Sequence, residues 1–233
     1  MTTVGAIQQH APSAAPVAGS VVRRALLTAG VFSSVLYVFT DVAGGLRYPG
    51  YSFTSQAISE LMARGAPSES FVDPLFLACS LLAVAFGVGV FLEGRVNRSL
   101  RITGALLTIY AALGATGPTL FEMNQRGAGT LQGDAPHIIL TAIIALLLML
   151  AIGIGASAMG QRFRMFSYVS LFIVAFFGAL TGTFAEQLAA GQPTPDMGII
   201  ERVCIYAAML WIAVLGMALL QRRGRADVRS ALS

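Results

Sequence analysis

Seven charged or titratable residues lie near the ends of long apolar segments, where they could bind a substrate or an ion. A charge close to a membrane is costly unless it is paired or solvated, so each is a candidate for function. Carboxylates accept hydrogen bonds and bind cations, and histidine changes its charge near neutral pH. The candidates are Glu60, Glu122, Asp134, His137, Glu186, Glu201 and Arg202.

Three of these candidates also have simple structural explanations. Glu186 lies near the end of the fifth apolar segment and Arg202 at the start of the sixth, so an ion pair between them would join two helices. His137 follows Asp134 by three residues, so it is either a proton-responsive group held by a carboxylate or the donor of a structural hydrogen bond.

Several classes of chemistry are disfavoured by the residues that the chain lacks. It contains no lysine, which excludes a Schiff base, and no HExxH pair, GxSxG elbow or glycine-rich phosphate loop. A catalytic zinc usually takes three protein ligands, and His137 is the only histidine in the apolar region. We therefore expect no metal and no cofactor, with a carboxylate-rich metal site as the open alternative. The enzymatic alternative is a hydrolase or transferase acting on an envelope lipid, with Glu60 or Glu122 as base and His137 as acid.

The elements that must position these residues are membrane helices. The chain has 233 residues, of which 56% are hydrophobic and only 11% charged. A helix needs about 20 apolar residues to cross a bilayer, and only helices or closed barrels satisfy their backbone there. Six segments are long enough, so we predict an all-α integral membrane protein with a six-transmembrane-helix bundle. These segments are residues 25–46, 74–92, 102–121, 136–159, 166–188 and 199–220.

Arginine positions predict the orientation of the bundle. Most of the fifteen basic residues, all arginine, lie at the segment ends shared with both termini, whereas Arg47, Arg64, Arg126 and Arg202 lie at the opposite ends. The positive-inside rule then places both termini in the cytoplasm of a multi-pass protein of the cell membrane, in a bacterium the inner membrane. Because the arginines serve orientation, we expect no nucleic-acid partner.

The same pattern divides the chain into three parts. Residues 1–22, which include His10, are rich in Ala, Pro and Ser without periodicity and are expected to be a disordered cytoplasmic tail. Residues 23–221 form the six-helix membrane domain, and residues 222–233 form a basic cytoplasmic tail.

The first outer loop, "YPGYSFTSQAISELMARGAPSES", predicts a short amphipathic helix. Ser55 can cap it, Ile58, Leu61 and Met62 share one face, and Gly65 ends it. Glu60 then points away from the apolar face. Such a helix either covers the outer mouth of the bundle or lies at the membrane surface without partners. Glu60 would bind a ligand or fasten the helix to Arg126 or Arg202.

This loop also carries a resemblance to a known family. Together with "GDAPHIILT" and "GIIERVCIYAAMLW", it resembles the bacterial and archaeal membrane family called domain of unknown function 998. The resemblance covers roughly residues 25–220. It implies a six-helix membrane domain and carries no established reaction.

The residues and the topology together favour a membrane protein that binds or transports a small solute or lipid through an acidic outward-facing vestibule. A noncatalytic envelope assembly or sensing protein is a further alternative beside the enzyme. Expected partners are membrane lipids, a small solute or another membrane protein, and six spans leave room for an oligomer.

Overall fold

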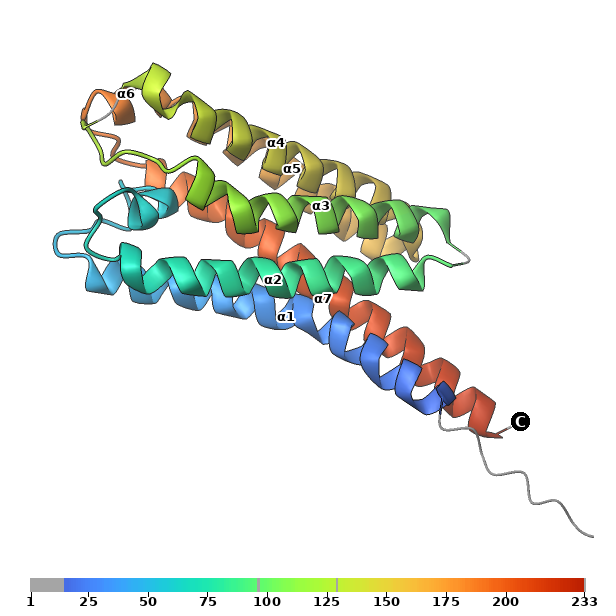
Figure 1. The fold of residues 1–233 in the computed structure, drawn as a ribbon. Helices are drawn as coiled ribbons and strands as arrows, with labels where there is room; N and C mark the ends of the chain where they lie inside the picture. Colours follow the sequence, from blue (N-terminus) through green and yellow to red (C-terminus); the bar gives the residue numbers. More distant parts are fainter. Residues whose placement is uncertain (1–14, 96, 129, 233) are drawn as a thin grey trace, which may run out of the picture.

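The computed structural model of the chain is built from helices alone and describes residues 15–95, 97–128 and 130–232. His10, in the expected tail, lies outside these residues. Figure 1 shows the long helices running roughly along one axis. The elements are α1 (Ala15–Arg47), η1 (Ile58–Met62), α2 (Glu69–Glu93), α3 (Arg98–Leu120), α4 (Leu131–Gly155), η2 (Ala156–Ala158), α5 (Gln161–Gly182), α6 (Ala185–Ala189) and α7 (Met197–Leu232).

Six of these helices, α1, α2, α3, α4, α5 and α7, are long and apolar enough to cross a membrane. The six predicted spans are therefore confirmed, and they indicate a multi-pass membrane protein. The helices follow one another around a closed ring, because each packs against its neighbours in the chain and α7 packs back against α1. Which end faces the cytoplasm stays a prediction.

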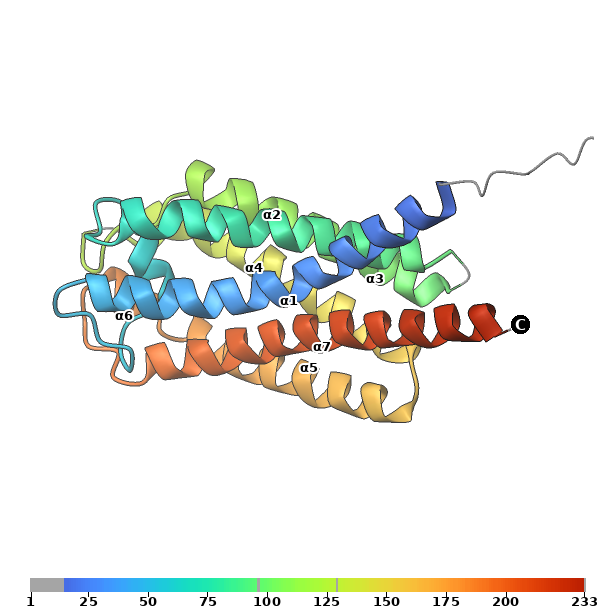
Figure 2. The same ribbon diagram turned by 90° about the horizontal axis from the view of Figure 1, so that it is seen from below.

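The two ends of the bundle differ in content. One end, here called the termini end, carries the start of α1, the end of α7 and the α2–α3 and α4–α5 connections (Figures 1 and 2). The opposite end, here called the η1 end, carries η1, α6 and the connections α3–α4 and α6–α7. The chain thus places η1 and α6 at the same end of the bundle.

Large side chains fill the middle of the ring. Leu27 of α1, Phe86 of α2, Leu107 of α3, Ile152 of α4 and Trp211 of α7 are all buried in one cluster. The indole N–H of Trp211 donates to the Ser167 hydroxyl of α5 at 2.9 Å, which satisfies the one polar group of this side chain. A smaller cluster lies at the η1 end, where Ile58 and Leu61 pack against Val72 and Phe76.

The largest differences from the predicted helix boundaries are at three helix ends. α1 begins at Ala15, so residues 15–22 are helical; Pro16 is tolerated there because the first turn of a helix needs no N–H donor. α7 continues through the predicted basic tail to Leu232. α5 ends at Gly182 and not near residue 188, because Thr183 leaves the helix and donates its hydroxyl to the Leu180 carbonyl at 2.7 Å.

The predicted helix of the first loop exists, but it is a 3₁₀-helix of five residues. Its N-cap is Ala57, and the Glu60 carboxylate accepts the Ala57 N–H at 2.8 Å; Ser55 does not cap it. Ile58 and Leu61 face the core as expected. Residues 51–64, here called the η1 segment, lie between Gly50 and Gly65, which both adopt φ = +77°, a conformation that favours glycine.

Candidate functional site

A buried ion pair joins the first and the last helix near the η1 end. Arg202 of α7 donates from Nε to Oδ2 of Asp41 at 2.9 Å and from Nη2 to Oδ1 at 2.8 Å. Asp41, on α1, is 0% exposed. The Tyr206 hydroxyl donates a third hydrogen bond to Asp41 at 2.5 Å. This bidentate geometry is the strong form of an arginine–carboxylate contact.

Arg202 also holds the η1 segment. Its Nη1 donates to the carbonyls of Phe53 at 2.9 Å and Gln56 at 3.0 Å, and its Nη2 donates to the Tyr51 hydroxyl at 2.7 Å. Burial raises the pKa of Tyr51 above its ordinary range even though Arg202 lies beside it. The phenol therefore stays protonated, and it donates in turn to the Ala57 carbonyl at 2.8 Å.

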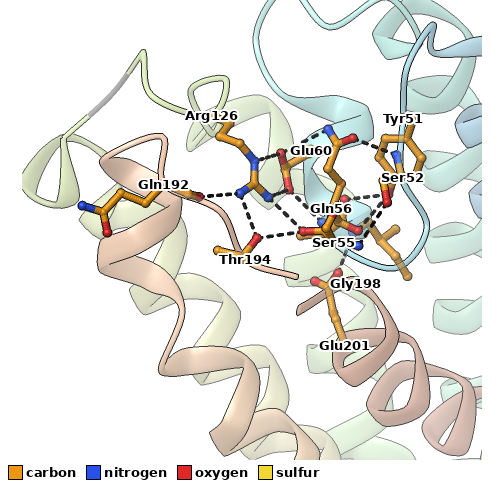
Figure 3. A network of polar contacts seen from close by, with 12 residues as sticks. Tyr51, Ser52, Ser55, Gln56, Glu60, Arg126, Gln192, Thr194, Gly198 and Glu201 are labelled. Carbon is orange, nitrogen blue, oxygen red and sulfur yellow. Dashed lines mark hydrogen bonds and ion pairs between the residues drawn. The ribbon is translucent and has the colours of Figure 1, made fainter. Parts of the chain in front are cut away.

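A second arginine, Arg126, also binds this segment (Figure 3). Arg126, in the α3–α4 connection, donates from Nε to Oε2 of Glu60 at 3.0 Å and from Nη2 to Oε1 at 2.7 Å. Glu60 is only 3% exposed, so its carboxylate is buried within the protein. The physical reason is that Arg126 and the Ala57 N–H satisfy the buried carboxylate.

Arg126 further binds the α6–α7 connection. Its Nη1 donates to the Thr194 hydroxyl at 2.8 Å and to the Gln192 carbonyl at 3.1 Å. Its Nη2 and the Thr194 hydroxyl both donate to the Ser55 carbonyl. Three connections of the chain therefore meet at this guanidinium. The side chains tied together at this end are here called the η1 network: Asp41, Tyr51, Gln56, Glu60, Arg126, Thr194, Glu201, Arg202 and Tyr206.

Glu201 is the member of the η1 network with spare hydrogen-bonding capacity. Its Oε2 accepts the Ile58 N–H, and its Oε1 has no partner within the described part of the chain. The side chain is partly exposed. By contrast, Glu60 accepts from Arg126 twice, from Ala57 and from Gln56 at 3.4 Å, which fills about four acceptor positions of a carboxylate. Glu201 could therefore accept a further donor or cation.

Three predicted candidates lie elsewhere, around the α3–α4 connection. Glu122 pairs with Arg64 at 2.7 Å, with both side chains substantially exposed. Asp134 accepts from the backbone and side-chain nitrogens of Asn124 at 3.0 and 2.9 Å. His137 places Nδ1 3.0 Å from the Phe121 carbonyl. Asp134 and His137 thus have separate partners, so Asp134 does not hold the His137 ring in the structure.

Glu186 is exposed on α6, and the expected ion pair with Arg202 is wrong. Because α5 ends at Gly182, Glu186 is no longer in line with that helix, and Arg202 turns back to Asp41. Sequence reasoning did not select Asp41, Tyr51 or Thr194. A signal existed for Asp41, since it is the one acidic residue within the first apolar segment. The alternative in which Glu60 fastens the loop to Arg126 is confirmed.

The described residues contain no group of three or more His, Cys, Asp and Glu side chains placed to hold a metal ion. Cys79 is buried and Cys204 partly buried, and both are free thiols. Chemically, the η1 network can bind a hydrogen-bond donor or a cation at Glu201.

Comparison with known proteins gives one match. Residues 15–218 match the family described as Protein of unknown function (DUF998). No curated protein and no solved structure matches the chain.

Proposed function

The chain belongs to the DUF998 family, and we propose that this multi-pass membrane protein binds or transports a small solute or lipid at its η1 end. The ligand site lies under the η1 segment and includes Glu201. The class of ligand is a molecule that carries a cationic or hydrogen-bond-donating group, because that is what a free carboxylate oxygen binds.

The single observation that carries the proposal is the Oε1 of Glu201, which has no partner among the described residues, in a network whose other carboxylates are bonded to arginine. This partly exposed carboxylate lies beside two arginine–carboxylate pairs and can accept hydrogen bonds that the described residues do not supply.

The η1 segment is suited to cover this site. It packs against α1, α2 and α7, and it is bordered by the two left-handed glycines Gly50 and Gly65. Glu201 itself contacts the segment through the Ile58 N–H. A ligand that competes with the Ile58 N–H for Glu201 would loosen the η1 segment. Ligand binding would then be coupled to the opening of the site.

The orientation that suits this function has the η1 end outside and both termini in the cytoplasm, as the positive-inside rule favours for a cell-membrane protein. Cysteines introduced at exposed Ser70 and exposed Arg162, in a variant with Cys79 and Cys204 replaced by alanine, test it. A membrane-impermeant maleimide should label Ser70→Cys in intact cells and Arg162→Cys only after permeabilisation. The opposite pattern would reverse the proposed orientation.

The binding proposal is tested by native mass spectrometry of the purified protein and its co-purifying small molecules. Glu201→Gln keeps an acceptor for the Ile58 N–H but removes the charge, so a molecule bound to the wild type should be lost. Glu186→Gln is the matched control, because Glu186 is exposed on α6 and its carboxylate has no partner among the described residues. Identical adducts on the wild type, Glu201→Gln and the control would contradict the proposal.

The enzymatic alternative has less support. Both Glu60 oxygens are bonded to Arg126, and Glu122 is paired with Arg64, so neither is a free base. Incubation of the protein with a lipid extract and added divalent metal tests this alternative, and a new lipid product that requires His137 would favour it.

A further inference from the structure

A groove of about 310 Å³ opens on the α2–α3 pair, in the half of the bundle nearer the termini end. It is lined by Val88, Phe91, Ala105, Thr108 and Ile109. This volume is at the low end of the roughly 300–1,000 Å³ typical of small-molecule sites. The one polar side chain, Thr108, donates its hydroxyl to its own helix at the Gly104 carbonyl, 2.8 Å away. The groove therefore presents an apolar lining.

The groove follows from how closely α2 and α3 approach. A Cβ atom on Gly104 would lie 2.2 Å from the Phe91 backbone nitrogen, and one on Gly87 would lie 2.6 Å from the Thr108 nitrogen. The two backbones are thus in contact, and the side chains beside them flank the crossing. Phe91 and Ile109 stay 38% and 51% exposed, so the protein itself does not cover the lining.

Unpaired positive charge lies at the termini end of this groove. Arg95, Arg98 and Arg101 are exposed, and none of the three forms an ion pair among the described residues. Arg98, Arg101 and Ala105 are spaced i, i+3 and i+7 on α3, which places them along one face of the helix. The Arg101 guanidinium lies 5.2 Å from the centre of the Phe91 ring, at the wall of the groove.

We propose that this groove binds one acyl chain of a phospholipid whose anionic headgroup contacts Arg98 and Arg101. Apolar lining and adjacent unpaired arginines match the two parts of such a lipid, since guanidinium groups bind phosphate strongly and basic pockets between membrane helices bind anionic headgroups. The site does not depend on the proposed function, because it lies at the other end of the bundle from Glu201.

Native mass spectrometry of the detergent-purified protein, titrated with phosphatidylglycerol or phosphatidylcholine of identical chains, tests the proposal. The wild type should bind phosphatidylglycerol at a lower concentration. In Arg98→Gln/Arg101→Gln this preference should fall on the order of tenfold. Ala105→Phe fills the groove and should weaken the binding of both lipids. The unfolding temperature of this variant shows whether it folds normally.

The matched control is Arg162→Gln/Arg164→Gln, which removes the same charge from exposed arginines of α5 at the same end of the bundle. This variant should keep the preference for phosphatidylglycerol. Equal binding of the two lipids by the wild type would overturn the proposal. An equal loss of the preference for phosphatidylglycerol in the control and in Arg98→Gln/Arg101→Gln would also overturn it. Phosphatidylglycerol binding unchanged in a folded Ala105→Phe would also overturn it, because the chain would then not occupy the groove.

Discussion

Arg202 and Arg126 form similar contacts in different settings. Each donates two hydrogen bonds to a carboxylate, and each donates others to backbone carbonyls of the η1 segment. Arg202 lies on a long helix, and its partner Asp41 on another is 0% exposed. Arg126 lies in a connection with its side chain 22% exposed, and its partner Glu60 is on a five-residue helix. The first pair joins the first and last helices of the ring, and the second joins the η1 segment to the α3–α4 connection.

This difference determines whether water can hydrate the charge that remains when each pair is broken. A charge left alone inside the bundle finds no solvent, so removing one partner of a buried pair costs far more than the pair itself contributes. A partly exposed guanidinium can be hydrated instead. We therefore expect the same chemical change to have unequal effects at the two sites.

Asp41→Asn should have the largest effect, because it leaves Arg202 charged and without its carboxylate. The expected loss of folding free energy is about 3–5 kcal/mol, visible as a lower unfolding temperature and less monodisperse protein in detergent. Asp41→Leu combined with Arg202→Leu should recover part of this loss. If the double variant is no better than Asp41→Asn, the damage does not come from the uncompensated charge.

Glu60→Gln makes the same change at the second pair and should cost less, about 1–3 kcal/mol. Its clearest effect should be local, with faster amide hydrogen exchange in residues 51–64 and little change in α2 or α7. A global loss equal to that of Asp41→Asn would remove the distinction between the two arginines.

Tyr51→Phe tests the hydroxyl that links Arg202 to the Ala57 carbonyl. It should cost about 1 kcal/mol, because one buried donor and one acceptor lose a partner. Stability measurements at pH 7 check this value against the two charge variants.

The same variant predicts a pH dependence. The pKa of Tyr51 is raised in the folded protein, so its contribution to stability is present below the ordinary tyrosine value of about 10 and is lost as the pH rises beyond it. The unfolding temperature of the wild type should therefore fall more steeply above pH 10 than that of Tyr51→Phe. Parallel curves for the two proteins would contradict the assigned role.

Arg64→Ala should have the smallest effect, below about 1 kcal/mol, because the Arg64–Glu122 pair is exposed and screened. Unfolding measured at low and high salt should show that even this contribution shrinks as salt is added. A larger loss would mean that the α3–α4 connection depends on this pair, as the η1 segment depends on Arg126.

The sequence alone predicted the six spans because hydropathy over 20 residues is a strong local signal. It was less informative at the η1 end. Glu60 and Arg126 are 66 residues apart, and Asp41 and Arg202 are 161 apart, so no local pattern identifies them as partners. Local reasoning matched Arg202 with nearby Glu186 instead. Similarly, the apolar face of η1 was correct, but the inward position of Glu60 depends on an arginine from another connection.

The two partners of the Asp41–Arg202 pair are translated at different times. Asp41 is translated within the first helix, whereas its counter-charge arrives only with the last one, 161 residues later. Until α7 is inserted, the carboxylate of Asp41 in the nascent chain has no arginine partner. A chain that terminates before α7 never gains this partner. Truncation before α7 removes Arg202 and leaves Asp41 unpaired, so we expect the truncated protein to be a substrate for membrane-protein quality control.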